Sequence, residues 1–128
     1  MSLELNYLFF AVLLTFVQVL ITAAAANQQV GLAVLAGNRE GMPELTGFAG
    51  RAKRAHLNML ENLVLFAALV FVATATNKIN AMTGLGATIF FWSRLVYAMV
   101  YLLGISWLRT GVWFVSVIGM GIIAWQIL

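Results

Sequence analysis

The chain has 128 residues, of which 63% are hydrophobic and only 9% are charged. Soluble domains usually carry about 25% charged residues. This composition therefore excludes an ordinary soluble domain and indicates a membrane protein. The net charge is +3, but most Lys and Arg side chains flank apolar runs, so we expect them to set membrane topology and expect no nucleic acid as a partner. The chain contains no Cys, one His and four acidic residues, which excludes a disulfide framework and a protein thiol nucleophile and argues against a metal site.

The first half of the chain predicts two apolar helices separated by a loop. The first runs from Leu5 to about Ala26. It has no basic flank and exceeds the roughly 7–15 residues of a signal-peptide core, so we expect it to be a retained span. A polar stretch with Gly, Asn and Pro at residues 27–47 predicts a loop. The second helix is predicted from about Phe48 to Thr76.

The second half predicts two further helices joined by short turns. Residues 77–80 form a polar turn, and the third helix is expected over about 81–105, with Arg94 in its interior. A turn at 106–111 then precedes a fourth, uncharged helix that reaches the C-terminus. Because a span needs about 20 residues, four spans account for the length. We therefore expect one domain over 1–128, an all-α four-transmembrane-helix bundle.

Basic residues are distributed unequally between the two ends of these helices. The second loop carries Lys78 alone, whereas the first and third loops, with the adjoining helix ends, carry Arg39, Arg51, Lys53, Arg54 and Arg109. Since basic loops stay in the cytoplasm, the first and third loops are predicted to be cytoplasmic, with both termini on the opposite side of the membrane. Topology alone accounts for Lys53, and it is an alternative explanation for Arg51 and Arg109.

Polar side chains follow one face of the second helix. At about 100° per residue, five of them fall within a sector roughly 100° wide: Arg51, Arg54, Asn58, Glu61 and Asn62. Lys53 and His56 point elsewhere, and for His56 we expect a packing or interfacial role. Counting back about 20 residues from the end of the helix places Asn58 and Glu61 within the hydrocarbon thickness. An ionised group there costs at least ~2.5 kcal/mol, so such groups normally face protein or water.

A second polar stripe lies on the third helix, where Arg94, Tyr97 and Tyr101 share one face at spacings i, i+3 and i+7. The depths of Arg94 and Glu61 agree within about 5 Å at the rise of an α-helix, so we predict that these two residues form an ion pair. The pair could be a purely structural lock and the tyrosines interfacial aromatics. However, two facing stripes, with Arg109 beside them, exceed what anchoring needs and predict a basic cleft open to the cytoplasm.

Such a cleft suits a small zwitterionic ligand with several carboxylates, together with a lipophilic second substrate. Arg binds carboxylates in a bidentate fork, and a Glu and an Asn suit an ammonium or amide group. The block RAHLNMLEN at residues 54–62, followed by Phe66, resembles the signature of the MAPEG family, the membrane-associated proteins of eicosanoid and glutathione metabolism. It is especially similar to the microsomal glutathione transferases. The four-span layout and the third-helix stripe are similar as well, so the resemblance covers essentially the whole chain.

The resemblance implies a homotrimer in the lipid bilayer, with glutathione as cosubstrate between subunits near the cytoplasmic face and a small lipophilic electrophile as second substrate. It implies that Arg109 stabilises the glutathione thiolate, since a nearby cation lowers the thiol pKa from about 8.5. No metal is implied. With the residues of both stripes, the candidate glutathione-binding set is Arg51, Arg54, Asn58, Glu61, Arg94, Tyr97 and Tyr101.

Several positions depart from the family pattern. Val64 and Leu65 stand where members often have Pro, Thr110 and Trp113 stand where some have Ser and Tyr, and an Arg near the end of the first helix is missing. These departures argue against eicosanoid synthesis and do not decide whether glutathione is used. Our first hypothesis is an integral-membrane glutathione transferase, with or without peroxidase activity. Two alternatives stay open: a non-enzymatic scaffold or lipid-binding member of the same fold, and a small transporter, which the lack of an inverted repeat disfavours.

Overall fold

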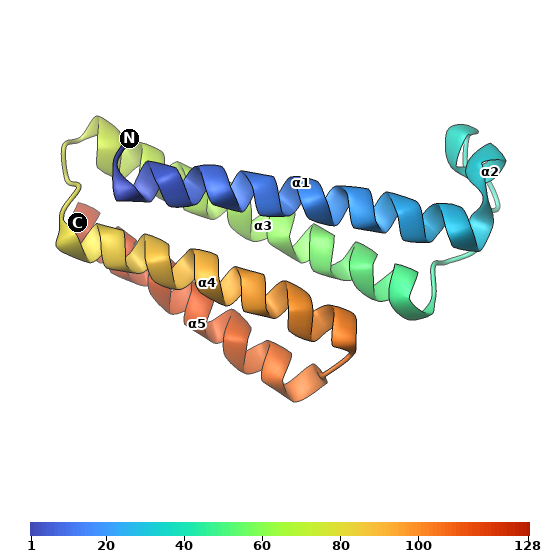
Figure 1. The fold of residues 1–128 in the computed structure, drawn as a ribbon. Coiled ribbons are helices and arrows are strands. Elements are labelled where there is room, and N and C mark those ends of the chain that lie inside the picture. Colours follow the sequence, from blue (N-terminus) through green and yellow to red (C-terminus); the bar gives the residue numbers. More distant parts are fainter.

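The structure, a computed structural model, describes all 128 residues and is entirely helical. Four of the helices are long, and Figure 1 shows them running back and forth, with both termini at the same end of the bundle. The helices are α1 (Leu3–Val30), α2 (Leu32–Ala36), α3 (Gly47–Ala75), α4 (Ala81–Leu103) and α5 (Ser106–Ile127). All except the short α2 are long and apolar enough to cross a membrane, so the expected all-α four-helix architecture is confirmed.

The boundaries of the helices follow local capping chemistry. The Ser2 hydroxyl accepts a hydrogen bond from the Leu5 N–H at the start of α1. At the start of α4, the Asn80 side chain accepts from the N–H groups of Met82 and Thr83. Such caps satisfy backbone donors that have no partner inside the helix. At the other end of α4, Gly104 adopts φ +80°, a left-handed conformation that glycine adopts without steric cost.

Two expectations about the connections need correction. The loop predicted at 27–47 is shorter, because α1 continues to Val30 and the apolar segment Leu32–Ala36 forms α2 after a break at Gly31. The turn predicted at 106–111 is also absent, since α5 already begins at Ser106. The left-handed Gly104 reverses the chain within two residues, so a longer turn is not required.

The core lies where α1, α3, α4 and α5 meet. The rings of Phe66 on α3 and Phe90 on α4 are stacked with centroids 4.0 Å apart, and both side chains are fully buried. Near the termini, the Thr83 hydroxyl donates to Glu4 Oε1 at 2.7 Å, which ties α1 to α4. The helix α3 runs without interruption past Val64, consistent with the lack of a Pro there.

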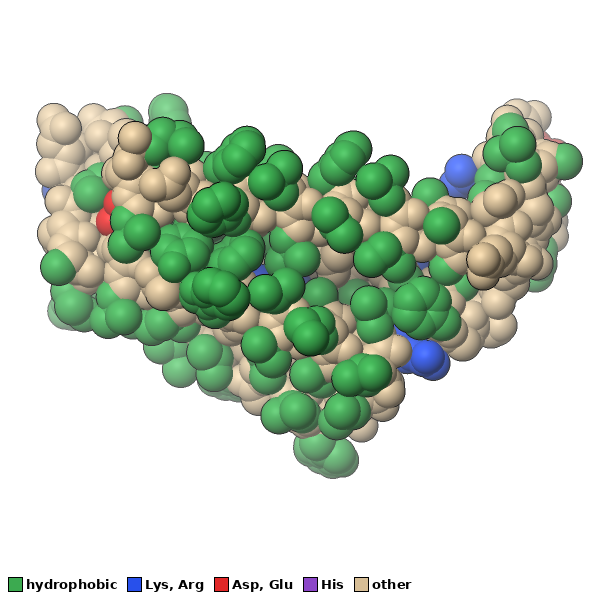
Figure 2. All heavy atoms as spheres, viewed as in Figure 1, with side chains coloured by type: hydrophobic (Ala, Val, Ile, Leu, Met, Phe, Trp, Pro, Cys, Tyr) green, Lys and Arg blue, Asp and Glu red, His purple; other side chains and the backbone are tan.

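The outer surface is apolar over most of the length of the helices. Figure 2 shows hydrophobic side chains covering much of one face, while its larger basic areas lie toward the end opposite the termini. Large side chains such as Phe16, Phe71 and Trp125 are more than half exposed. A soluble protein would bury such a surface, whereas lipid solvates it. This surface therefore fits a protein that spans a membrane.

Candidate functional site

The polar stripe on α3 and the polar stripe on α4 face each other between the two helices, as the sequence predicts. Three hydrogen bonds join them: Arg51 Nε donates to the Leu102 carbonyl at 3.1 Å, Arg54 Nε to the Tyr101 hydroxyl at 3.1 Å, and Arg94 Nη2 to Asn58 Oδ1 at 2.8 Å. The contacts extend over about two turns of each helix and lie in the half of the bundle away from the termini. The side of α3 that carries Arg51, Arg54 and Asn58 is thus directed toward α4.

Arg94 is the most deeply buried charged side chain of this region, with only 1% of its surface exposed. Its guanidinium carbon lies 4.1 Å from the centre of the Tyr97 ring, a distance at which a cation is attracted by the ring face. The Nε and Nη1 groups have no hydrogen-bond partner. Arg94 therefore lies behind the Asn58 carboxamide, enclosed by α3 and α4.

The predicted ion pair between Glu61 and Arg94 is wrong within the subunit. The hydrogen bond that Arg94 makes goes to Asn58, and its other nitrogens are unpaired, while Glu61 is exposed. Asn58 and Glu61 point about 60° apart on a helix. The rotation of α3 turns Asn58 toward α4 and leaves Glu61 on the outside of the subunit. The rise of a helix predicts the depth of a residue along the membrane, but it does not determine how the helix is rotated about its axis.

Arg109 lies at a small cavity where α3, α4 and α5 meet. The cavity has a volume of about 150 Å³ and is lined by Asn58, Tyr97, Arg109, Thr110 and Trp113. No acidic side chain lines it, so the charge of Arg109 is not compensated there. An anion, or a group that becomes one, is the ligand that such a cavity favours.

Tyr101 connects two cations at this end of the bundle. The Arg109 guanidinium carbon is 4.3 Å from the centre of the Tyr101 ring, and the Tyr101 hydroxyl accepts from Arg54. Tyr97 packs edge-on against Tyr101, with ring centres 5.7 Å apart. The aromatic pair thus holds Arg54 and Arg109 close together without neutralising either charge.

Arg51 and Asn62, at the two ends of the α3 stripe, also make hydrogen bonds within the subunit. Arg51 donates to the Leu102 carbonyl near the C-terminus of α4, where backbone carbonyls lack helical partners. Asn62 is buried and donates to the Asn58 carbonyl at 2.8 Å and to Asn58 Oδ1 at 3.3 Å. Their polar groups support the helices and the Asn58 side chain.

The sequence prediction did not include the α5 side chains Thr110 and Trp113 among the lining residues. Trp113 is four residues after Arg109, so both project from the same face of α5. That spacing is the signal that would have identified Trp113. Thr110 carries no comparable signal, because it is the neighbour of Arg109 and its place depends on how α5 crosses α4.

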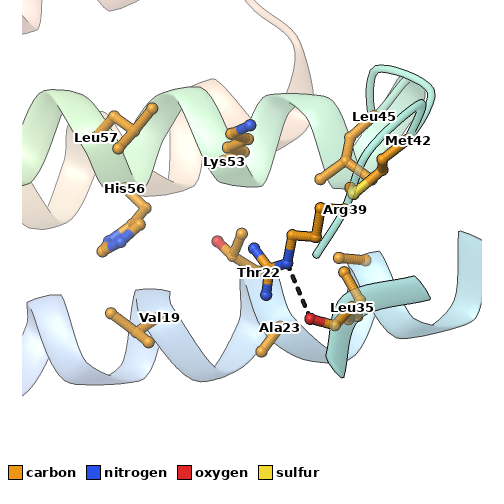
Figure 3. Close-up of a pocket in the computed structure, with 11 residues that line it drawn as sticks. Val19, Thr22, Ala23, Leu35, Arg39, Met42, Leu45, Lys53, His56 and Leu57 are labelled. Carbon is orange, nitrogen blue, oxygen red and sulfur yellow. Dashed lines mark hydrogen bonds between the residues drawn. The ribbon is translucent and has the colours of Figure 1, made fainter. Parts of the chain in front are cut away.

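A second cavity, of about 320 Å³, lies between α1, α3 and the segment that joins them. It contains the two residues that the periodicity sets aside from the stripe, Lys53 and His56, together with Arg39. Figure 3 shows His56 pointing from α3 toward α1, while Arg39 reaches between the helices and donates to the Leu35 carbonyl at 2.9 Å. His56 Nδ1 is buried without a partner. His56 therefore faces a cavity as well as the packed helices.

Comparison with known proteins gives one positive result. Neither the search of curated proteins nor that of solved structures found a match. The model of the MAPEG family, in contrast, matches residues 7–128, which is nearly the whole chain. The protein therefore belongs to the MAPEG family of membrane proteins of eicosanoid and glutathione metabolism.

Proposed function

We propose that the protein is a membrane-embedded glutathione transferase, similar to the microsomal enzymes of its family, that joins glutathione to a lipophilic electrophile. The observation that carries the proposal is the uncompensated Arg109 guanidinium at a cavity shared with Asn58 and Tyr97. In a chain of the MAPEG family, a cation at such a cavity suits a thiol that reacts as its thiolate. Arg109 is the proposed catalytic residue.

The chemistry requires a thiolate that the chain itself cannot supply, because it contains no Cys. Glutathione loses its thiol proton to water, and the cation of Arg109 stabilises the sulfur anion that remains. The sulfur then forms a bond to the electrophilic carbon, and the leaving group departs with its electron pair. The proposal includes peroxidase activity as a second use of the site. The same thiolate would attack the terminal oxygen of a lipid hydroperoxide and break the O–O bond, so that the lipid alkoxide leaves and takes a proton from water to become the alcohol. A second glutathione would then react with the resulting sulfenic acid to give the disulfide and water.

The remaining polar residues suit the charged ends of glutathione. Its two carboxylates match Arg51 and Arg54 on the α3 stripe, since arginine binds carboxylates bidentately, and this leaves Arg109 for the thiolate. Its ammonium group matches Glu61, the acidic residue of the α3 stripe. The apolar surface of α4 and α5 would allow the electrophile to arrive from the bilayer.

We further propose that the site is completed between subunits of a homotrimer, near the cytoplasmic face. A cavity of about 150 Å³ is small beside the roughly 300–1,000 Å³ of typical ligand pockets. The exposed Glu61 also lies at a depth where an ionised group on a lipid-facing surface costs at least ~2.5 kcal/mol. A neighbouring subunit would enlarge the cavity and shield Glu61 from lipid.

The decisive experiment replaces Arg109 with Ala and measures conjugation of glutathione with an aryl halide. A nearby cation lowers a thiol pKa by about 1–3 units, so the rate at pH 7 should fall about tenfold or more. The rate follows the thiolate fraction and rises with pH. In the variant this rise should move to higher pH, toward the ordinary thiol pKa of about 8.5.

Lys78→Ala serves as a control, because it removes a cation at the opposite end of the bundle, where Lys78 Nζ contacts the Ile127 carbonyl. Its rate and pH profile should match the unmodified protein. Arg109→Lys should recover part of the rate by restoring a charge. An Arg109→Ala variant with unchanged turnover would refute the catalytic role of Arg109.

The alternative is a non-enzymatic scaffold or lipid-binding protein of the same fold, which the small volume of the cavity favours. Calorimetry in detergent separates the two functions. Heat of binding that saturates at millimolar glutathione supports the transferase. No binding at these concentrations would favour the scaffold.

A further inference from the structure

The Asn58 carboxamide is held by two donors that both reach its oxygen. Arg94 Nη2 donates to Oδ1 at 2.8 Å and Asn62 Nδ2 donates to the same atom at 3.3 Å. Arg94 is 1% exposed and Asn62 is 7% exposed, so both donors are excluded from solvent. Oδ1 is thereby held on the inner side of Asn58.

The chemistry of arginine decides which way the carboxamide points. A guanidinium has only donors, so the atom of Asn58 that faces it must be the oxygen. The amide nitrogen then has to point the other way. Asn58 Nδ2 makes no hydrogen bond within the subunit, yet it is not among the buried polar atoms that lack a partner. Asn58 lines the cavity that contains Arg109.

We propose that Arg94 is a positioning residue that acts through Asn58: it holds Oδ1 inward so that the Asn58 NH₂ group is presented to the cavity as a donor. The inference rests on the proposed function, because the acceptor would be a carboxylate or peptide oxygen of glutathione. Arg94 itself does not touch the ligand, since its guanidinium lies behind Asn58 and is almost fully buried. This role differs from the direct contact that the sequence predicts for Arg94.

The burial of Arg94 is difficult to explain by stability alone. Its cation lacks an acidic partner and leaves two nitrogens unpaired, and replacing buried charges by apolar side chains of similar volume is often neutral or stabilising. If position 94 served only to fill space between the helices, methionine, an apolar side chain of similar volume, would serve as well as arginine. The orientation of Asn58 is a property that methionine cannot provide.

The test is a double-mutant cycle on glutathione affinity, measured by calorimetry in detergent. Arg94→Met and Asn58→Ala should each raise the Kd about tenfold, and the double variant should show no further loss, because both remove the same oriented donor. Arg94→Lys should recover part of the affinity. Asn58→Asp keeps a partner for Arg94 but removes the NH₂ group, so it should fold normally and bind as weakly as Asn58→Ala. Additive losses, or full affinity in Asn58→Asp, would overturn the proposal.

A measurement without ligand separates this inference from the proposed function. In protein labelled with ¹⁵N-Asn, the Asn58 side-chain NH₂ resonance, assigned through its loss in Asn58→Asp, should indicate a rigid group. In Arg94→Met its order parameter should fall below about 0.6, the value typical of flexible groups. An equal order parameter of the Asn58 NH₂ group in the unmodified protein and in Arg94→Met would refute the positioning role of Arg94. If the unmodified protein binds no glutathione, the proposed function fails. The order parameter of the Asn58 NH₂ group then still decides whether Arg94 orients Asn58.

Discussion

At the level of single residues, the candidate site pairs its cations with aromatic rings and a carboxamide. Arg94 lies over Tyr97 and Arg109 lies over Tyr101, contacts worth about 0.5–2 kcal/mol each. A ring face attracts a cation but leaves its charge in place. An acidic partner would have cancelled the attraction for an anionic ligand. Because the cations pack on Tyr97 and Tyr101 rather than on acidic side chains, this end of the bundle stays basic.

Glu61 is the residue whose role the structure changes most. Because it has no partner within the subunit, we expect Glu61→Gln to leave the folding of the subunit intact and to weaken glutathione binding by removing the charge that meets the ligand ammonium. The comparison uses two ligands, glutathione and an analogue without the α-amino group. The variant should lose about tenfold in affinity for glutathione, as expected for about 1.4 kcal/mol, and almost nothing for the analogue. Equal losses for both ligands would contradict an ammonium contact.

At the level of secondary structure, α4 and α5 pack closely because glycines lie at their crossing. A Cβ atom on Gly86 would lie 2.6 Å from the Gly119 carbonyl oxygen, and one on Gly119 would lie 2.7 Å from that of Gly86. Real Cβ atoms do not approach a carbonyl oxygen so closely, and small residues at such crossings allow membrane helices to approach each other. This crossing positions Arg109 on α5 relative to the tyrosines on α4.

We predict that Gly86→Ala separates the two helices and destabilises the protein by about 1–3 kcal/mol, the usual cost of overpacking. Thermal unfolding in detergent measures the loss, and glutathione binding should weaken in parallel as Arg109 moves. Gly121→Ala is the matched control, since a Cβ there meets nothing within 4 Å and alanine favours a helix. Equal stability of the two variants would show that the crossing tolerates a methyl group.

At the level of the whole molecule, the candidate site and most of the basic residues lie toward one end of the bundle, whereas Lys78 and both termini lie at the other end (Figure 1). The protein is an integral multi-pass membrane protein, and the charge rule predicts that the basic end is cytoplasmic. The absence of Cys permits single-cysteine labelling without background. A membrane-impermeant maleimide should label Asn38→Cys only from the cytoplasmic side of sealed vesicles and Thr76→Cys only from the other side. The reverse pattern would invert the proposed topology.

The proposed trimer predicts a particle whose protein mass in detergent is three times the 14.0 kDa of the chain. Native mass spectrometry measures this mass directly. The site is expected to need a neighbouring subunit, so dilution to monomers should abolish glutathione binding. A monomer that binds glutathione with undiminished affinity would contradict a site between subunits.

Much of the fold follows from local sequence. The second helix is expected from Phe48 to Thr76 and is found at Gly47–Ala75, because a polar loop with Gly and Pro precedes it and a short polar turn follows it. The short α2 is missed, since five apolar residues after Gly31 have no periodicity long enough to indicate a helix. The start of α5 is misplaced because the sequence does not reveal that Gly104 adopts a left-handed conformation.

The sequence by itself determined the four apolar helices, the basic end of the bundle and the two polar stripes, because hydropathy and helical period are properties of each segment alone. The tertiary structure decided which side chains of those stripes meet. Whether Arg94 contacts Glu61 or Asn58 depends on a rotation of α3 by about 60°, and the place of Arg109 depends on the crossing at Gly86 and Gly119. Rotation and crossing arise from packing between helices, so no single segment encodes them.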